Sequence, residues 1–184
     1  MDTFRKASEY IVSEIASALK AIKEEQQESL MQSIQQAKRV FFVGAGRSCL
    51  MLNAFCMRLN HLGIESYVAG NIPCPPVGQE DLVIAMTGSG STASVLAITS
   101  HSKEYGTTVF AITAGPDTLI EKISDKVLYI PAPTKESPSP GKTSSQLMGT
   151  LFEQVASIIF DTIIMQLSED RDLEKIAARH TNLE

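Results

Sequence analysis

The sequence has little of what a nucleic-acid-binding protein needs. Its 184 residues carry a formal net charge of −5, the pI is near 5.3, and no dense run of Lys or Arg occurs. Binding a phosphate backbone requires a concentrated positive patch, because the backbone is itself densely charged. The sequence therefore predicts no nucleic-acid partner.

Patterns that bind metals are missing as well. The three cysteines contain no C-x-x-C pair and cannot form an even set of disulfides. The histidines share no metal-ligand spacing with one another or with a cysteine; they are His61, His101 and His180. We therefore expect no metal site and no cofactor. Cys49 and Cys56 lie seven residues apart on one helix face, which is more typical of core packing than of chemistry.

Long hydrophobic runs are also lacking. No apolar stretch approaches the roughly 18 residues that a membrane span requires. The opening stretch, MDTFRKASEYIVSEI, does not combine a basic start with a following apolar segment, which is the pattern of a secretion signal. These absences predict a soluble, cytoplasmic protein with no membrane partner.

What is present is the composition of an ordinary globular chain, with 43% apolar and 20% charged residues. A chain of this length suits one domain, and neither a fixed-period repeat nor a linker interrupts it. We predict a single domain over residues 1–184, with N-terminal helices in 1–38, an α/β core in 40–167 and a C-terminal tail in 168–184.

Short apolar runs alternate with helical patterns through the middle of the chain. Ahead of them, apolar residues recur every three or four positions between residues 4 and 38, which predicts two amphipathic helices. The runs typical of buried strands are RVFFVG, SYVA, DLVIAM, TVFAIT and KVLYI, with helical stretches at about 47–63, 92–105 and 117–124. Strands that are apolar on both faces fit a parallel sheet covered by helices. The predicted fold class is a doubly wound α/β fold of about five parallel strands.

The last third of the chain has three parts. PAPTKESPSPGKTSS, residues 131–145, predicts a long irregular loop. The next segment, 146–167, is apolar on most of its circumference and predicts a buried helix. A polar tail follows it.

Two loops rich in glycine and hydroxyl residues follow predicted strands, GAGRS at 44–48 and TGSGST at 87–92. Ligands of an open parallel sheet bind beyond the carboxyl ends of its strands, so both loops are expected to face one crevice. In the second loop, several hydroxyls and the N–H groups of the next helix start together suit a phosphate monoester. These hydroxyls belong to Thr87, Ser89, Ser91 and Thr92. Helix capping, the simpler explanation, would account for one or two of them, so the four together favour phosphate.

A dinucleotide site is the rival interpretation, because Gly44-Ala-Gly46 follows a strand and Glu65 lies at about the distance of a ribose ligand. Two details oppose it. The third glycine position holds Cys49, and Glu65 precedes the next strand instead of following it. A loop of the G-x-x-x-x-G-K type is excluded too, because neither loop has a lysine after its glycines.

Five segments together resemble a known family: GAGRS, MRLNHLG, TGSGST, MGTLFEQ and RHTNLE. From about Val40 to its end, the chain is similar to the sugar isomerase (SIS) fold and, within it, to the 6-phospho-3-hexuloisomerases. The resemblance implies one flavodoxin-like domain, a homotetramer and no metal. It also implies conversion of D-arabino-hex-3-ulose 6-phosphate into fructose 6-phosphate through an enediol, in the ribulose monophosphate pathway of formaldehyde fixation. Functional coupling to a 3-hexulose-6-phosphate synthase is a further expectation.

The resemblance assigns roles to particular residues. The catalytic candidates are Glu153 and His180 as acid/base groups, and Arg47 as the group that stabilises the enediolate or contacts the phosphate. The substrate-binding candidates are Gly46, Ser48, Thr87, Ser89, Gly90, Ser91 and Thr92. Without the resemblance, Glu153 would be explained as a residue at a helix start and His180 as a solvated residue of the tail.

Two positions depart from the family pattern. Cys49 stands where glycine is common, and Ser91 stands where an S-G-E-T pattern has glutamate. The second change removes a carboxylate from the pocket, and an enzyme that used it as the base would be inactive. The alternative function is therefore a non-catalytic SIS-type sensor of phosphosugars. Such sensors usually carry a DNA-binding helix-turn-helix, and residues 1–38 show no basic recognition face.

Overall fold

A five-stranded, all-parallel sheet forms the centre of the computed structural model, which describes residues 3–134, 144–169 and 171–182. The strands are β1 (Val40–Gly44), β2 (Ser66–Val68), β3 (Leu82–Met86), β4 (Thr108–Thr113) and β5 (Lys126–Tyr129). Their order across the sheet is β2-β1-β3-β4-β5. This is the flavodoxin-like order, so the predicted fold class is confirmed. The strand order reverses between β1 and β3, which is where such sheets bind ligands.

The central strands are buried on both faces. All five residues of β3 are buried, as are the first four of β1, and the residues from Val109 to Thr113 in β4. Runs rich in Val, Ile and Phe suit such positions because branched and aromatic side chains pack well on a pleated surface.

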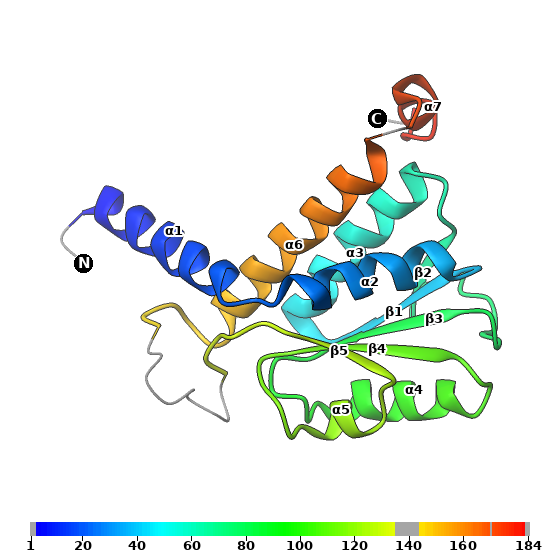
Figure 1. Cartoon of the computed structure of the whole chain (residues 1–184), viewed down its shortest axis with the longest axis horizontal. Coiled ribbons are helices and arrows are strands. Elements are labelled where there is room, and N and C mark those ends of the chain that lie inside the picture. The colour runs from blue at the N-terminus through cyan, green and yellow to red at the C-terminus, as the bar shows by residue number, and fades with distance from the viewer. Residues whose placement is uncertain (1–2, 135–143, 170, 183–184) are drawn as a thin grey trace.

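Helices cover both faces of the sheet (Figure 1). On one face lie α2 (Glu24–Gln36), α3 (Gly46–His61) and α6 (Thr150–Ser168), while α4 (Ala93–Lys103) and α5 (Leu119–Lys122) cover the other. The first helix, α1 (Phe4–Lys20), packs against α6 and extends beyond the edge of the sheet. The predicted pair of N-terminal helices is therefore present.

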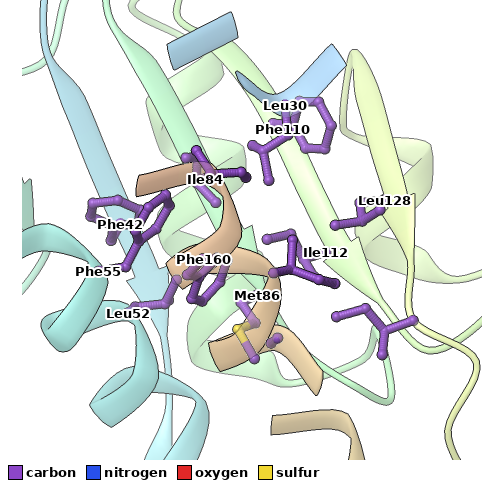
Figure 2. Close-up of a cluster of buried hydrophobic side chains, with 14 of the residues drawn as sticks. Leu30, Phe42, Leu52, Phe55, Ile84, Met86, Phe110, Ile112, Leu128 and Phe160 are labelled. Atoms are coloured by element: carbon purple, nitrogen blue, oxygen red, sulfur yellow. The ribbon is translucent and has the colours of Figure 1, made fainter. Parts of the chain in front are cut away.

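An aromatic stack joins the sheet to its covering helices. The ring of Phe55 in α3 lies 5.5 Å from Phe42 of β1 and 4.4 Å from Phe160 of α6, measured between ring centroids. Figure 2 shows these rings within the cluster of buried side chains over one face of the sheet. Burying a Phe side chain contributes about 1.5 to 3 kcal/mol. The stack fixes α3 and α6 side by side, and the starts of both helices carry candidate site residues.

The apolar segment 146–167 does not become helical at its first residue, as the sequence predicted. The helix α6 begins at Thr150, because Met148 and Gly149 have positive φ angles of 30° and 78°. The backbone of these two residues is left-handed, so they precede the right-handed helix and are not part of it. Leu147 is therefore left 77% exposed in a turn. Residues 135–143 of the predicted irregular loop lie outside the described residues.

The tail is more structured than its polar composition predicted. A short helix, α7 (Leu173–Ala177), begins after Asp172, whose side chain accepts hydrogen bonds from the N–H groups of Glu174 and Lys175. An acidic N-cap satisfies N–H groups that lack partners within the helix. Asp172 is thus the sequence signal for this helix, and the predicted tail did not include it.

The helix α6 corrects the statement that no apolar stretch approaches a membrane span. It is 19 residues long with a mean hydropathy of 1.3, so its length and composition would suffice. However, 44% of that window is buried inside the protein, with Phe160 and Ile163 in the core. The core helices of globular proteins share this length and composition, so these two properties alone do not establish a membrane span.

Candidate active site

A cavity of about 580 Å³ opens at the carboxyl ends of β1 and β3. Four segments line it: the start of α3, the loop after β3, the segment after β5 at Thr134, and the turn that leads into α6. The polar lining residues are Arg47, Ser48, Thr87, Ser89, Thr92, Thr134, Thr150 and Glu153. The two glycine loops thus face one cavity, as the strand order requires of neighbouring parallel strands.

The first loop brings α3 close to the sheet. A Cβ atom on Gly44 would lie 2.7 Å from Leu52 Cδ1 and 3.3 Å from the backbone of Cys49. Glycine is therefore needed where the strand meets the helix. Gly46, the first residue of α3, has a φ of +57°, and it does not line the cavity. The positive φ lets the chain turn into α3, and the predicted role of Gly46 in substrate binding stays a prediction.

In the second loop, Gly90 holds the tightest position. Its φ is +68°, and an added Cβ would lie 2.3 Å from Thr118 Cβ, at the start of α5. The Gly90 carbonyl accepts a hydrogen bond from the Ile120 N–H at 2.9 Å. α5 therefore supports the loop from behind, and no larger residue fits there.

The hydroxyls of this loop bond to one another. Thr87 Oγ1 and Thr92 Oγ1 are 2.8 Å apart, and Ser91 Oγ donates to Ser89 Oγ at 3.0 Å. Thr92 is the N-cap residue of α4, and its side chain makes no capping hydrogen bond. Capping therefore does not explain its hydroxyl. Gly90 and Ser91 lie in the loop but do not line the cavity.

Glu153 is the carboxylate among the residues that line the cavity. It is the fourth residue of α6, and its side chain is 12% exposed. Its Oε2 lies 3.1 Å from Arg47 Nε, and its Oε1 accepts from Ser48 Oγ at 3.5 Å. Burial raises the pKa of the Glu153 carboxyl above its ordinary value, while the Arg47 charge and the Ser48 hydroxyl oppose that rise. A carboxylate in this situation is a better base than one in water, because its protonated form is favoured.

Thr150 and Phe152 are site residues that the sequence analysis did not select. Thr150 Oγ1 accepts from Arg47 Nη1 at 3.1 Å. The Phe152 ring backs the second loop, since a Cβ on Gly88 would lie 3.3 Å from it. Both residues belong to the MGTLFEQ segment, so their closeness to Glu153 along the chain was the available signal.

His180 is not brought to this cavity within one chain. Its ring centroid lies 5.2 Å from that of His61, the last residue of α3, whereas Arg47 and Ser48 are at the start of that helix. Sixteen helical residues span about 24 Å, at 1.5 Å per residue. Figure 1 places α7 beyond the ends of α3 and α6. His180 and Glu153 of one chain are thus at opposite ends of α3.

The described residues contain no group of three or more His, Cys, Asp or Glu side chains that could hold a metal ion. The polar lining of the cavity offers hydroxyls, one guanidinium and one carboxylate. Hydroxyls and a guanidinium are groups that can bind an anion, and a carboxylate is one that can move a proton.

Comparisons with known proteins agree with this geometry. Residues 33–158 match the SIS domain. A 3-hexulose-6-phosphate isomerase of Bacillus subtilis is 34% identical over 97% of this chain and all of its own length. Another, from Mycobacterium gastri, is 35% identical over 93% of this chain and 86% of its own. A solved structure from Methanococcus jannaschii, described as inferring a 3-hexulose-6-phosphate isomerase function, superposes with a TM-score of 0.84 at 30% identity, over 97% of this chain and 99% of its own.

Proposed function

The chain belongs to the SIS-domain family, and we propose that it is a 3-hexulose-6-phosphate isomerase. It interconverts D-arabino-hex-3-ulose 6-phosphate and fructose 6-phosphate, in the ribulose monophosphate pathway. The observation that carries this proposal is the Glu153 carboxylate, which lines the cavity while its side chain is only 12% exposed. An isomerase needs such a base, whereas a protein that only binds a phosphosugar does not.

The phosphate group binds at the loop after β3. A phosphate needs several hydrogen-bond donors on small side chains that fit around it. Thr87, Ser89 and Thr92 line the cavity with such hydroxyls. The start of α4 follows directly, and a helix N-terminus favours an anion. Ser48 lines the cavity from α3, and its hydroxyl contacts Glu153, so it is placed to bind near the reacting carbons.

The reaction moves a carbonyl from C3 to C2. Glu153 removes the proton from C2, the C–H electrons form a C2=C3 double bond, and O3 gains a proton to give the enediol. The protonated Glu153 then returns its proton to C3, while O2 loses its proton and becomes the carbonyl. Atoms and charge balance without a cofactor. The guanidinium of Arg47 lies beside Glu153 and stabilises negative charge that develops on the enediolate oxygens.

His180 moves the proton between O2 and O3, acting from a neighbouring subunit. An imidazole titrates near neutral pH, so it can take a proton from one oxygen and give it to the other. Because His180 lies against His61, it does not serve the cavity of its own chain. A symmetric oligomer brings the tail of one subunit to another subunit's site.

The oligomer is a homotetramer, in the cytoplasm, with functional coupling to the synthase that makes its substrate. Several large apolar side chains remain exposed on the single chain, among them Phe4, Val12, Leu147 and Met165. Exposed apolar groups of this number support burial between subunits.

Serine in place of glutamate at position 91 does not favour a non-catalytic sensor over an enzyme. Its hydroxyl donates to Ser89, and the residue does not line the cavity. The carboxylate that does line the cavity is that of Glu153. Losing a glutamate at position 91 therefore leaves a base in place.

A coupled assay that reports fructose 6-phosphate, with the 3-ketose phosphate as substrate, tests the proposal. Wild-type protein is expected to turn over, and Glu153→Gln is expected to lose at least about a hundredfold in kcat, the usual scale for an acid/base group. Glu104→Gln is the matched control, because that side chain is 70% exposed and pairs only with His101. Phosphosugar binding without turnover in the wild type would instead establish a sensor.

A further inference from the structure

The hydroxyl of Thr150 joins two parts of the cavity wall. Thr150 Oγ1 donates its single proton to the Leu147 carbonyl oxygen at 2.5 Å, and the Thr150 N–H donates to that carbonyl at 2.9 Å. With its proton committed, the oxygen acts as an acceptor, which is what a guanidinium requires. Arg47 Nη1 supplies the donor at 3.1 Å. The hydroxyl is thus oriented by the turn before α6.

Arg47 is held by two partners on the same helix. Its Nε lies 3.1 Å from Glu153 Oε2 while its Nη1 bonds to Thr150, and both of these residues lie in the first turn of α6. The ion pair attracts the guanidinium to Glu153, and the hydrogen bond to Thr150 fixes the direction of one N–H of this planar group. Its Nη2 makes no hydrogen bond with residues 3–134, 144–169 or 171–182. That nitrogen is available to a substrate oxygen.

Burial alone does not hold this arginine in place. The Arg47 side chain is 46% exposed, and an ion pair with so exposed a partner is weakened by solvent. A long side chain also loses rotamer entropy when it is fixed in one position. A second, directional contact is therefore needed to keep the guanidinium beside Glu153, and the Thr150 hydroxyl supplies it.

We propose that Thr150 is a positioning residue: its hydroxyl holds the Arg47 guanidinium against Glu153 and so sets the ionisation of the catalytic carboxylate. The inference rests on the proposed function in assigning the base to Glu153. Burial favours the protonated form of Glu153, and the Arg47 charge favours the ionised form. If Arg47 were displaced, its charge would oppose the effect of burial less. The pKa of Glu153 would then rise, and the carboxyl would keep its proton to a higher pH.

The test compares Thr150→Val, which keeps the shape and removes the hydroxyl, with Thr150→Ser, which keeps the hydroxyl. Thr162→Val is the control, because Thr162 lies on the same helix and its hydroxyl donates to the Ile158 carbonyl of that helix. The pKa of Glu153 is measured by carbon-13 NMR of the carboxyl in the substrate-free protein. Thr150→Val is expected to raise this pKa, while Thr150→Ser and Thr162→Val leave it near the wild-type value.

Activity gives the second readout. In Thr150→Val, kcat/KM should fall about tenfold, the scale of one hydrogen bond to a charged group, and its acid limb should move to higher pH. In an Arg47→Ala background, Thr150→Val should cause no further change, because the group that it positions is gone. This double-mutant cycle separates positioning from a structural role at the helix start, which would persist without Arg47.

Three results would overturn the inference: an unchanged Glu153 pKa in Thr150→Val, equal behaviour of the Val and Ser variants, or an undiminished effect of Thr150→Val in the Arg47→Ala protein. Failure of the proposed function is distinct, since wild-type protein would then form no fructose 6-phosphate. The NMR titration still decides the inference in that case, because it needs no turnover.

Discussion

Arg47 Nε lies 3.1 Å from Glu153 Oε2, and the two partners differ in burial, with side chains that are 46% and 12% exposed. The carboxylate is therefore the desolvated member of the pair, which suits the base role proposed for it. The arginine remains close to solvent, where its Nη2 can meet a bound oxyanion while its Nε stays beside Glu153. Two helices that are far apart along the chain, α3 and α6, must pack correctly for this pair to form.

The first prediction concerns pH. Burial raises the pKa of Glu153 above its ordinary value of 4.5, and the base must be ionised to act. As pH falls, kcat/KM should therefore begin to drop at a higher pH than an unperturbed glutamate would give. Arg47→Gln removes the main opposing charge and should move this acid limb further upward. A limb at or below 4.5 in the wild type would argue against Glu153 as the base.

Removing a phosphate contact should weaken substrate binding. Ser89→Ala takes away a hydroxyl that lines the cavity, and a hydrogen bond to a charged group is worth about 1.5 to 3 kcal/mol, or tenfold to a hundredfold in Kd. Isothermal titration calorimetry with a phosphosugar measures the change. Ser13→Ala, an exposed serine of α1 bonded to the Tyr10 carbonyl, is the control. Equal affinity in the Ser89 variant would remove this residue from the phosphate site.

The second loop should not tolerate a side chain at its centre. Gly90→Ala combines a φ of +68° with a Cβ only 2.3 Å from Thr118, so we expect a loss of about 1 to 3 kcal/mol in the free energy of unfolding. Gly115→Ala is the matched control, because a Cβ there has nothing within 4 Å and its φ is not positive. Urea unfolding of both variants decides the matter. A Gly90 variant as stable as the control would mean that α5 does not restrain the loop.

Mixed oligomers test whether His180 acts between subunits. Glu153→Gln and His180→Ala chains should each be inactive alone, and chains unfolded and reassembled together should regain part of the activity. The reason is that some sites then combine an intact Glu153 from one chain with an intact His180 from another. Hybrids that stay inactive, while both parents still bind phosphosugar, would show that the histidine does not serve a neighbour.

Chelator treatment should leave turnover intact. The proposed steps use Glu153, Arg47 and His180 and route no charge through a metal. The coupled assay is run before and after dialysis against a chelator. Activity that is lost on dialysis and restored by added zinc or magnesium would contradict the mechanism.

Much of the fold followed from the sequence. Short apolar runs such as VFFVG and LVIAM read as strands because a parallel sheet buried on both faces needs side chains that are apolar at every position. These strands alternate with helical patterns along the chain, and few topologies other than a parallel sheet with helical connections fit that order. The glycine loops predicted a binding site because each follows a strand, and parallel strands have their carboxyl ends at the same edge of the sheet.

Prediction from the sequence failed where the backbone departs from the conformation that the local residue pattern favours. An apolar run starting at Gln146 gave no sign that Met148 and Gly149 turn left-handed and delay α6 to Thr150. A polar tail concealed α7, because the Asp172 cap is a local signal in a segment without an apolar face. Hydrophobic periodicity reports burial, and neither feature depends on burial.

The sequence alone thus determined which residue types are present and which loops carry them. These are a carboxylate that could act as a base, a guanidinium, and hydroxyl residues in the glycine loops. Tertiary structure decided which of them meet. The packing of α3 against α6 puts Arg47 on Glu153 and Thr150, while the same helix α3 keeps His180 at its far end, beside His61. The distance between side chains on different helices depends on how those helices pack on the sheet. The number of residues between them in the sequence does not determine it.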